Sequence, residues 1–235
     1  MKITKLGHAA VLVDVNDARI LIDPGSFSSD EAFGLTGLDA VIVTHRHHDH
    51  VAPERLEDLL ALNTDAVLLA GASTAAGLGP LAKANFRLLP PDQSMRIGDV
   101  DVTSVGGLHA VIHEDFPREE NIGVVLSPAD GPRFFHPGDS YEYTPENIQV
   151  LAVPISSPWG KLSEAVEFVR SVSPATMFPI HDALFSEHGK KLFWSWIPQL
   201  AGSEISSISP SEGNPVEYNS SGEFVRSGSL DNPAA

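Results

Sequence analysis

The chain contains no cysteine among its 235 residues. This absence excludes a disulfide framework, and it also excludes thiolate ligands for any metal ion. A metal site in this protein must therefore be built from histidine, aspartate and glutamate, which are the other common ligands.

Basic residues are scarce, since 15 Lys and Arg stand against 31 Asp and Glu, which gives a formal net charge of −16. A protein of this charge repels the phosphate backbone of nucleic acids unless a local basic patch overcomes the overall field. No basic cluster is visible in the sequence. The charge thus argues against a nucleic-acid partner and leaves a small-molecule substrate as the expectation.

Long hydrophobic runs are also missing. No stretch approaches the roughly 20 apolar residues that a membrane span needs. The N-terminal segment lacks the apolar core of a secretory signal, because polar residues interrupt it at Asp14, Asn16 and Asp17. We therefore expect a cytoplasmic protein without membrane contact, and on base rates alone a homo-oligomer is a reasonable expectation.

The length and the hydrophobic content of 42% suit one large globular domain. We expect this domain over residues 1–222 and a loose C-terminal tail over residues 223–235, where Ser, Gly, Asn and Pro are frequent. Short apolar runs predict strands at residues 9–15, 19–22, 40–43, 66–70, 86–89, 100–105, 123–126, 133–135, 150–153 and 176–179. Apolar residues at helical spacing predict helices at residues 53–62, 161–172 and 187–200, the last ended or interrupted near Pro198. Two strand-rich halves with intervening helices indicate two sheets that pack face to face and are covered by helices.

The most informative motif is His45-Arg46-His47-His48-Asp49-His50, which directly follows the predicted strand at residues 40–43. Imidazole and carboxylate groups are ligands that borderline divalent metals accept. His45 and His47 are two residues apart on extended backbone, so their side chains point to the same side. Asp49 and His50 follow in the turn and can reach a second ion. The segment therefore predicts the beginning of two metal sites, with His48 facing away.

Further ligands must come from elsewhere, because each ion wants about four donors. Three later positions follow predicted strands: His109, Asp139 and His181. Asp139 comes after Gly138, which permits a close approach of the backbone, and its two carboxylate oxygens can bridge two ions. The sequence thus predicts a dinuclear centre.

The ordered pattern of HxHxDH, a later His, a Gly-Asp and a final His resembles the metallo-β-lactamase superfamily over Asp23 to His181. The flanks Gly7-His8-Ala9, Ile22-Asp23-Pro24 and His181-Asp182 look most like its cytoplasmic branch of ascorbate-phosphate lactonase-like and uncharacterised hydrolases. The secreted antibiotic-degrading branch usually has a Cys at its second metal. The resemblance implies an α+β fold, a four-layer αββα sandwich of two mixed β-sheets flanked by helices.

The resemblance also implies a ligand set. His45, His47 and His109 would hold one ion, Asp49, His50 and His181 would hold the other, and Asp139 would bridge them. The ions would be two divalent metals, with zinc the first expectation and manganese or iron also compatible with these donors.

Several assignments stay open. The third-motif ligand is His109 or His113, and we favour His109 because it follows the Gly-rich strand end; His113 would then lie near the ligands or face substrate. His8 either approaches the site or is a structural histidine. Asp23 is a candidate to accept protons from ligand imidazoles. We interpret His136 as a structural histidine and His188 as solvated, and nothing in the sequence distinguishes Trp159, Lys161, Arg118 or Tyr141 from surface residues.

These observations predict a metal-dependent hydrolase that activates water against a small ester-, lactone- or phosphodiester-type substrate. Asp49 and Asp139 are the candidate catalytic proton acceptors. The alternatives are a nuclease of the same superfamily, an iron-dependent oxidoreductase on the same scaffold, and a non-enzymatic metal-binding protein. The resemblance disfavours the oxidoreductase, because the diiron branch usually has Glu where this chain has His47.

Overall fold

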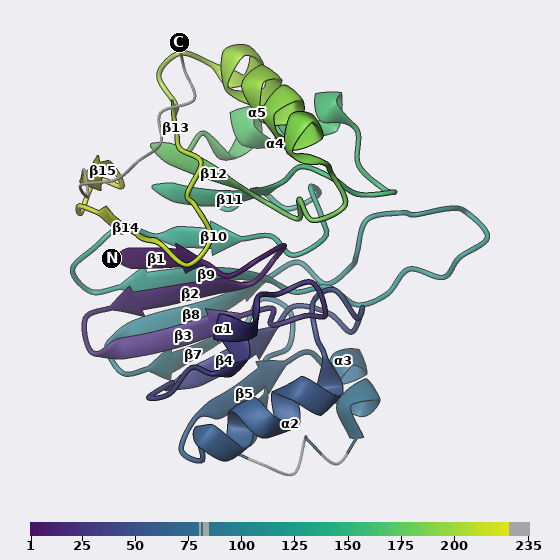
Figure 1. Ribbon diagram of the computed structural model, residues 1–235, viewed down its shortest axis with the longest axis vertical. Coiled ribbons are helices and arrows are strands. Elements are labelled where there is room, and N and C mark those ends of the chain that lie inside the picture. The colour runs from purple at the N-terminus through teal and green to yellow at the C-terminus, as the bar shows by residue number, and fades with distance from the viewer. Residues whose placement is uncertain (80, 82–84, 226–235) are drawn as a thin grey trace.

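The computed structural model describes residues 1–79, 81 and 85–225. Over these residues the chain forms two mixed β-sheets that lie face to face, with helices on both outer sides (Figure 1). The predicted four-layer αββα sandwich is thereby confirmed. The first sheet has the order β15-β14-β1-β2-β3-β4-β5-β6, and its strands are β1 (Lys2–Lys5), β2 (Val11–Val15), β3 (Ala18–Ile22), β4 (Ala40–Val43), β5 (Val67–Ala70), β6 (Phe86–Leu88), β14 (Pro215–Tyr218) and β15 (Phe224–Val225).

The second sheet has the order β13-β12-β11-β10-β9-β8-β7. Its strands are β7 (Ser94–Ile97), β8 (Val100–Val105), β9 (Gly123–Pro128), β10 (Phe134–His136), β11 (Val150–Pro154), β12 (Thr176–Ile180) and β13 (Ser206–Ser207). The outer layers consist of α1 (Asp30–Phe33), α2 (Pro53–Leu62) and α3 (Ala72–Leu78) on the first sheet and α4 (Leu162–Val172) and α5 (Glu187–Ala201) on the second.

Alternation of side chains along the strands builds three apolar layers. On β2, Val11 and Val13 point into the core between the sheets, whereas Leu12 packs on the side of α1 and α2. This alternation follows from the pleat, which turns successive side chains to opposite faces. On the second sheet, Phe134 joins the central core and Phe135 packs toward α4 and α5. Because both faces of each sheet are covered at its centre, central strands such as β4, β5 and β11 are apolar almost throughout.

The helices follow their sequence signals closely. α2 begins at Pro53, a residue whose fixed φ suits the first helical position. α4 begins after Lys161, whose backbone N–H donates to the Glu164 carboxylate at 3.0 Å. α5 continues through Pro198 to Ala201, so the expected break near this proline does not occur.

The strand directions bring the functional loops to one edge of the sandwich. β1 and β3 are both antiparallel to β2, and β4 is parallel to β3, so these strands end at the same edge. β8 and β10 are both antiparallel to β9, and β12 runs parallel to β10 through β11. The segments that follow these strands carry His8, Asp23, His45, His109, Asp139 and His181.

The structure also adds elements that the sequence prediction missed. These are the short or marginal strands β1, β7, β13, β14 and β15 and the helices α1 and α3. Within the predicted C-terminal tail, Phe224 and Val225 form β15 and pair with β14, and residues 226–235 lie outside the described residues. No helix in the described part of the chain is long and apolar enough to cross a membrane.

Candidate metal centre

Asp23 organises the start of the HxHxDH segment. It follows β3 in a left-handed conformation with φ of 52°, and its carboxylate oxygens accept hydrogen bonds from the backbone N–H of Thr44 at 2.8 Å and from the Thr44 hydroxyl at 2.7 Å. The Asp23 oxygen that accepts from the Thr44 hydroxyl, Oδ2, also accepts a hydrogen bond from Nδ1 of His50 at 2.7 Å. One fully buried carboxylate thus fixes both ends of the motif.

Gly25 lets two loops cross at close range beside this carboxylate. A Cβ atom at this position would lie 1.9 Å from the backbone oxygen of Asp49, and the Ser26 N–H donates to the His48 carbonyl at 2.7 Å. Only glycine fits such a contact. The turn that carries Asp49 and His50 is therefore held directly against the turn that follows β3.

Two groups of four side chains meet at this edge. The first group contains His45, His47, His109 and Asp139, and one potential ligand atom from each lies within 4.8 Å of the others. Nε2 of His45 and Nδ1 of His47 are 3.1 Å apart. Two nitrogens that bind one zinc ion at about 2.0 to 2.1 Å are separated by roughly 3.3 Å in a tetrahedral site. The first group therefore has the dimensions of a metal site.

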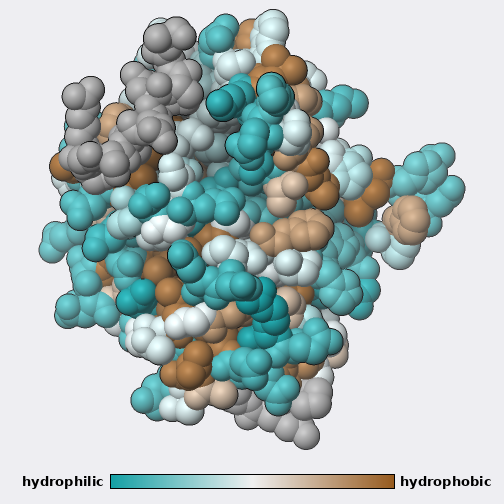
Figure 2. Space-filling view, viewed as in Figure 1, coloured by the Kyte–Doolittle hydropathy of each residue, from teal (hydrophilic) through white to brown (hydrophobic). Residues whose placement is uncertain are grey.

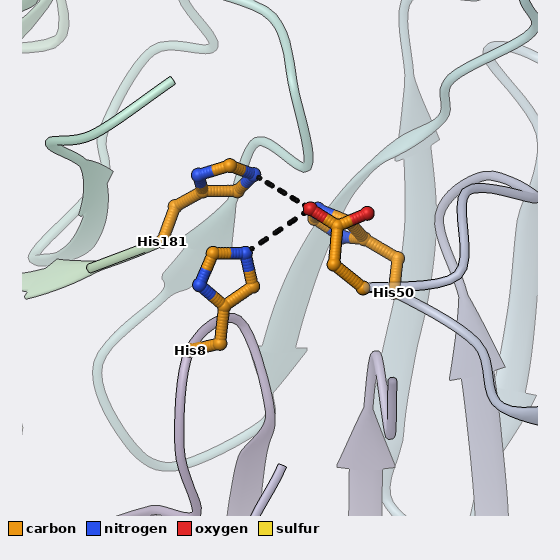
Figure 3. Close-up of side chains that lie close together, drawn as sticks. His8, His50 and His181 are labelled. Atoms are coloured by element: carbon orange, nitrogen blue, oxygen red, sulfur yellow. Dashed lines mark hydrogen bonds and ion pairs between the residues drawn. The ribbon is translucent and has the colours of Figure 1, made fainter. Parts of the chain in front are cut away.

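The second group contains His8, Asp49, His50 and His181, whose ligand atoms also lie within 4.8 Å of one another. Figure 3 shows the imidazoles of His8 and His181 converging on one carboxylate oxygen beside His50. This oxygen is Oδ2 of Asp49, which lies 3.2 Å from Nε2 of His8 and 3.4 Å from Nε2 of His181.

Asp139 belongs to the first group and also reaches the second. Its Oδ1 atom is 3.0 Å from Nε2 of His50, and its Oδ2 atom is 3.1 Å from Nε2 of His181 and 3.3 Å from Nε2 of His109. The preceding Gly138 adopts φ of 59°, and a Cβ atom there would lie 2.2 Å from Oδ1 of Asn121. Asn121 in turn accepts the Asp139 N–H at 2.9 Å. The carboxylate is thus held where it can contact both groups.

The outward nitrogens of four ligand candidates are held by neighbouring oxygens. Nδ1–H of His50 donates to Asp23, that of His109 donates to the Ala110 carbonyl at 2.7 Å, and that of His181 donates to the Ser156 carbonyl. The Thr44 hydroxyl gives its proton to Asp23, so it accepts from Nδ1–H of His45 at 3.0 Å. Hydrogen bonds of this kind select the tautomer and orient metal-binding imidazoles.

A second, independent observation supports metal binding by these residues, namely buried polar atoms that have no hydrogen-bond partner. Nε2 of His50, His109 and His181 and Oδ1 of Asp139 are buried and have no hydrogen-bond partner. A buried polar atom without a partner is costly, and here the four atoms face one another. Because the outward nitrogens hold one proton of each imidazole, loss of any second proton leaves inward lone pairs, which a divalent cation would satisfy.

A family model described as a β-lactamase superfamily domain matches residues 2–181. The chain belongs to the metallo-β-lactamase superfamily. Protein Rv0786c of Mycobacterium tuberculosis is 36% identical to it over 206 residues, which cover 87% of this chain and 95% of the relative. UPF0173 metal-dependent hydrolase Atu1317 of Agrobacterium fabrum is 32% identical over 151 residues, which cover 60% of this chain and 63% of the relative.

Solved structures agree with this placement at the level of the fold. The metallo-β-lactamase fold protein YhfI from Bacillus subtilis superimposes with a TM-score of 0.69 at 17% identity, covering 92% of this chain and 99% of that protein. The family model and the relatives confirm the predicted superfamily and the prediction of a metal-dependent hydrolase.

In this metallo-β-lactamase-fold hydrolase, His8 connects the candidate ligand Asp49 to the segment that follows β12. It has a left-handed backbone with φ of 48°, and its carbonyl accepts the His181 N–H at 2.9 Å. Its Nδ1 atom accepts the Ala183 N–H at 3.2 Å. A neutral imidazole carries its proton on the other nitrogen, so Nε2–H donates to Asp49. The geometry makes His8 a hydrogen-bond donor to a ligand candidate.

Charge coupling across the centre is strong in the metal-free protein. Burial opposes protonation of His181, but the carboxylates of Asp139 and Asp49 outweigh burial and raise the pKa of His181 to about 9. Burial is likewise outweighed at His50, where Asp139 and Asp23 raise the pKa. Burial dominates at His45 and holds its pKa well below the ordinary value. The imidazole of His181 thus carries a second proton at neutral pH, which a metal ion has to displace.

The remaining histidines of this chain lie outside the two ligand groups. His113 has a side chain that is 58% exposed and lies 3.5 Å from Asp115, so His109 is the residue that the fold brings to the centre. The buried His136 donates from Nε2 to the Ala9 carbonyl at 2.9 Å and accepts the Gly138 N–H at 3.2 Å. His48 and His188 are exposed.

Two neighbours of the candidate ligands were missed from the sequence. The indole N–H of Trp159 donates to Oδ2 of Asp139 at 2.8 Å. Nε of Arg118 donates to the His109 carbonyl at 2.7 Å, and its guanidinium pairs with Glu142 at 2.6 Å. Neither residue belongs to a motif, because each acts through a contact that exists only after the loops have packed. Tyr141 packs edge-on against Trp159, with ring centroids 4.9 Å apart, and thereby supports it.

Proposed function

We propose that this chain uses a dinuclear zinc centre to hydrolyse a small ester- or lactone-type substrate, with phosphodiesters as a further candidate class. The observation that carries the proposal is the pair of four-residue groups, which Asp139 of the first group connects through its contacts with His50 and His181. Nitrogen and oxygen donors without thiolate suit zinc, and they also accept manganese or iron.

In this proposal, one ion would be held by His45, His47 and His109 and the other by Asp49, His50 and His181, and Asp139 would contribute to both sites. When bound, the ions would acidify a water molecule and polarise the substrate oxygen on which charge develops. The protein's own contribution is positional, because Asp23 and the carbonyls of Ala110 and Ser156 hold the imidazoles in their ligating tautomers.

We assign different roles to the two carboxylates. The Asp139 side chain is only 3% exposed and contacts both groups, which suits a residue that holds the centre together. The Asp49 side chain is 24% exposed, so it can exchange a proton with a reacting group at the open side. His8 donates to Oδ2 of Asp49 and thereby holds this carboxylate in place.

The experiment is a turnover assay on protein that has been purified without a histidine tag, stripped of metal and reloaded with zinc, manganese or iron. The panel contains p-nitrophenyl acetate, a γ-lactone, a thioester and bis-p-nitrophenyl phosphate. We expect ester or lactone hydrolysis that depends on metal and falls at least about a thousandfold in Asp139→Ala, since the bridging ligand is lost. Asp99→Ala removes an exposed carboxylate from the β7–β8 turn and serves as the matched control.

Full activity of Asp139→Ala, or hydrolysis that persists without metal, would contradict the proposal. The nuclease and the iron-dependent oxidoreductase have no specific observation in their favour among the described residues. A gel-shift assay with RNA at low salt and an oxygen-uptake assay after anaerobic loading with iron test these two alternatives directly.

A further inference from the structure

A small pocket opens beside the first ligand group. Its volume is about 140 Å³, and its wall includes the ligand candidates His47 and His109 together with Ala110, Ile112, Phe116 and Pro117. Arg118 and Glu119 also line it, and each is paired with an opposite charge, Glu142 and Arg46 respectively. This volume is close to the roughly 150 Å³ of an engineered apolar cavity that binds benzene. A group of about this size could lie in the pocket while the bond next to it lies over the metal ligands.

The apolar wall comes from residues 110–118, which we call the arm. The arm connects β8 and β9 and is the loop that projects at the right of Figures 1 and 2. Its base is fixed, because the His109 N–H donates to the Glu119 carbonyl at 3.0 Å and the Ala110 N–H donates to the Asp139 carbonyl at 2.8 Å. The arm is therefore tied to two ligand candidates.

The arm exposes large apolar side chains, including Ile112 at 42% and Phe116 at 65%. Isolated exposed apolar residues are common, but a group of them at the rim of a functional site marks a binding surface. The Phe116 N–H donates to the His113 carbonyl at 3.0 Å, which closes a turn within the arm.

The basic side chains next to the ligand segments are already neutralised. Arg118 pairs with Glu142 at 2.6 Å, and Arg46 pairs with Glu119 at 2.6 Å. On the other side of the centre, the buried Lys5 pairs with Asp182 at 2.5 Å. A substrate tail with a carboxylate or phosphate would have to displace these carboxylates from their basic partners. The net charge of −16 would also repel such a tail.

We propose that the pocket beside His47 and His109 binds an uncharged alkyl or aryl group of the substrate, which rests on the proposed hydrolysis at the same centre. The substrate class is thereby narrowed to neutral esters, thioesters or lactones with an apolar substituent. Ile112 and Phe116 are the specificity-determining residues, and the ligand histidines form the floor against which the reacting bond lies.

The test measures binding, so that it does not depend on turnover. Zinc-loaded protein is titrated by calorimetry with acetohydroxamic, butyrohydroxamic and hexanohydroxamic acids, whose hydroxamate chelates the metal and whose tails differ only in length. We expect the Kd of the unmodified protein to fall roughly two- to fourfold for each added methylene, as partial to full burial of that group predicts.

Ile112→Ser and Phe116→Ser should weaken this dependence on tail length to less than about twofold per methylene. Both side chains are exposed, so these variants should fold. Val111→Ser is the matched control, because Val111 lies on the same arm with 51% exposure but is absent from the pocket wall. It should keep the dependence of the unmodified protein.

The assignment is overturned if the unmodified protein binds none of the three acids, if its Kd is independent of tail length, or if all three variants respond alike. The outcome is separable from that of the proposed reaction. Length-dependent hydroxamate binding without turnover of any ester or lactone would support the pocket assignment and contradict the proposed reaction. Hydrolysis of p-nitrophenyl acetate and hexanoate with equal kcat/KM would support the proposed reaction and contradict the pocket assignment.

Discussion

The indole N–H of Trp159 donates a hydrogen bond to Oδ2 of Asp139 at 2.8 Å. Trp159 lies on the segment between β11 and α4, whereas Asp139 follows β10. The indole ring also stands edge-on to the imidazoles of His109 and His181, with centroid separations of 5.9 and 6.2 Å. Trp159 is thus a positioning residue for the carboxylate that we place between two metal ions.

Replacement of Trp159 by Phe should lower metal affinity and turnover by about 10- to 100-fold, the usual cost of losing a hydrogen bond to a metal ligand. The ring volume is largely kept, so the fold should persist. Zinc binding should also change the fluorescence of the unmodified protein through Trp159. Trp194→Phe is the control, because Trp194 packs against the core under α4 and α5. Equal zinc affinity and equal fluorescence response in both variants would contradict this role.

His8 should be needed for the correct orientation of Asp49. His8→Asn keeps a residue type that tolerates positive φ, but its shorter side chain cannot reach the carboxylate. We expect a loss of about 10- to 100-fold in turnover or in affinity for the more weakly held ion. Partial rescue by His8→Gln, which carries a longer amide donor, would distinguish the hydrogen bond from a structural role; metal affinity and kcat are measured in parallel.

Metal binding should become stronger as pH rises from 7 toward 9. In the metal-free protein, Asp139 and Asp49 overcome burial and raise the pKa of His181 to about 9, and the pKa of His50 is raised as well. These protons must leave when the ions bind, so affinity increases as the imidazoles deprotonate. Calorimetry of zinc binding in buffers of different ionisation enthalpy should detect proton release at pH 7.

The raised pKa of His181 should make the metal-free fold less stable as pH rises, whereas metal binding becomes stronger. A folded-state pKa above the unfolded value adds stability that is complete below about pH 6.5 and is lost as pH rises through about 9. Urea unfolding of metal-free protein should therefore show lower stability at pH 9 than at pH 6.5. Equal zinc affinity at pH 7 and 9, without proton release, would argue against protonated imidazoles at this centre.

The ion pair of Lys5 and Asp182 should be a main support of the loop that carries His181. Their side chains are only 4% and 5% exposed, with Nζ and Oδ2 2.5 Å apart. Asp182→Asn removes one partner of a buried pair, so we expect about 3 to 5 kcal/mol of destabilisation in urea unfolding. Asp99→Asn disrupts the exposed pair with Arg96 and should cost less than about 1 kcal/mol. Similar losses in the two variants would be inconsistent with this account.

Much of the fold was predictable because its central strands are apolar and its main helices have clear apolar stripes. β4 and α2, for example, lie where the sequence predicts them. The missed strands have weaker local signals. β7 is half polar, and β14 is held by pairing with β1, more than 200 residues earlier in the chain, through contacts such as Ile3 with Val216.

The sequence also predicted that the candidate ligands lie together, since ligand chemistry constrains residue type and spacing. Their partners were not predicted. Trp159 and Arg118 reach the centre through loop packing between distant strands, and no local pattern encodes this approach. The tautomer of His8 depends on a hydrogen bond from Ala183, in the turn that follows β12 of the other sheet. Such contacts follow from the assembled fold alone.

The most direct test of the central claim is the metal content of the zinc-reloaded chain by elemental analysis, beside the variants His47→Ala and Asp49→Ala. These two residues belong to different ligand groups and are partly exposed. The account predicts two ions per chain in the unmodified protein and one in each variant. One ion in the unmodified protein, or the same content in all three proteins, would contradict a dinuclear centre.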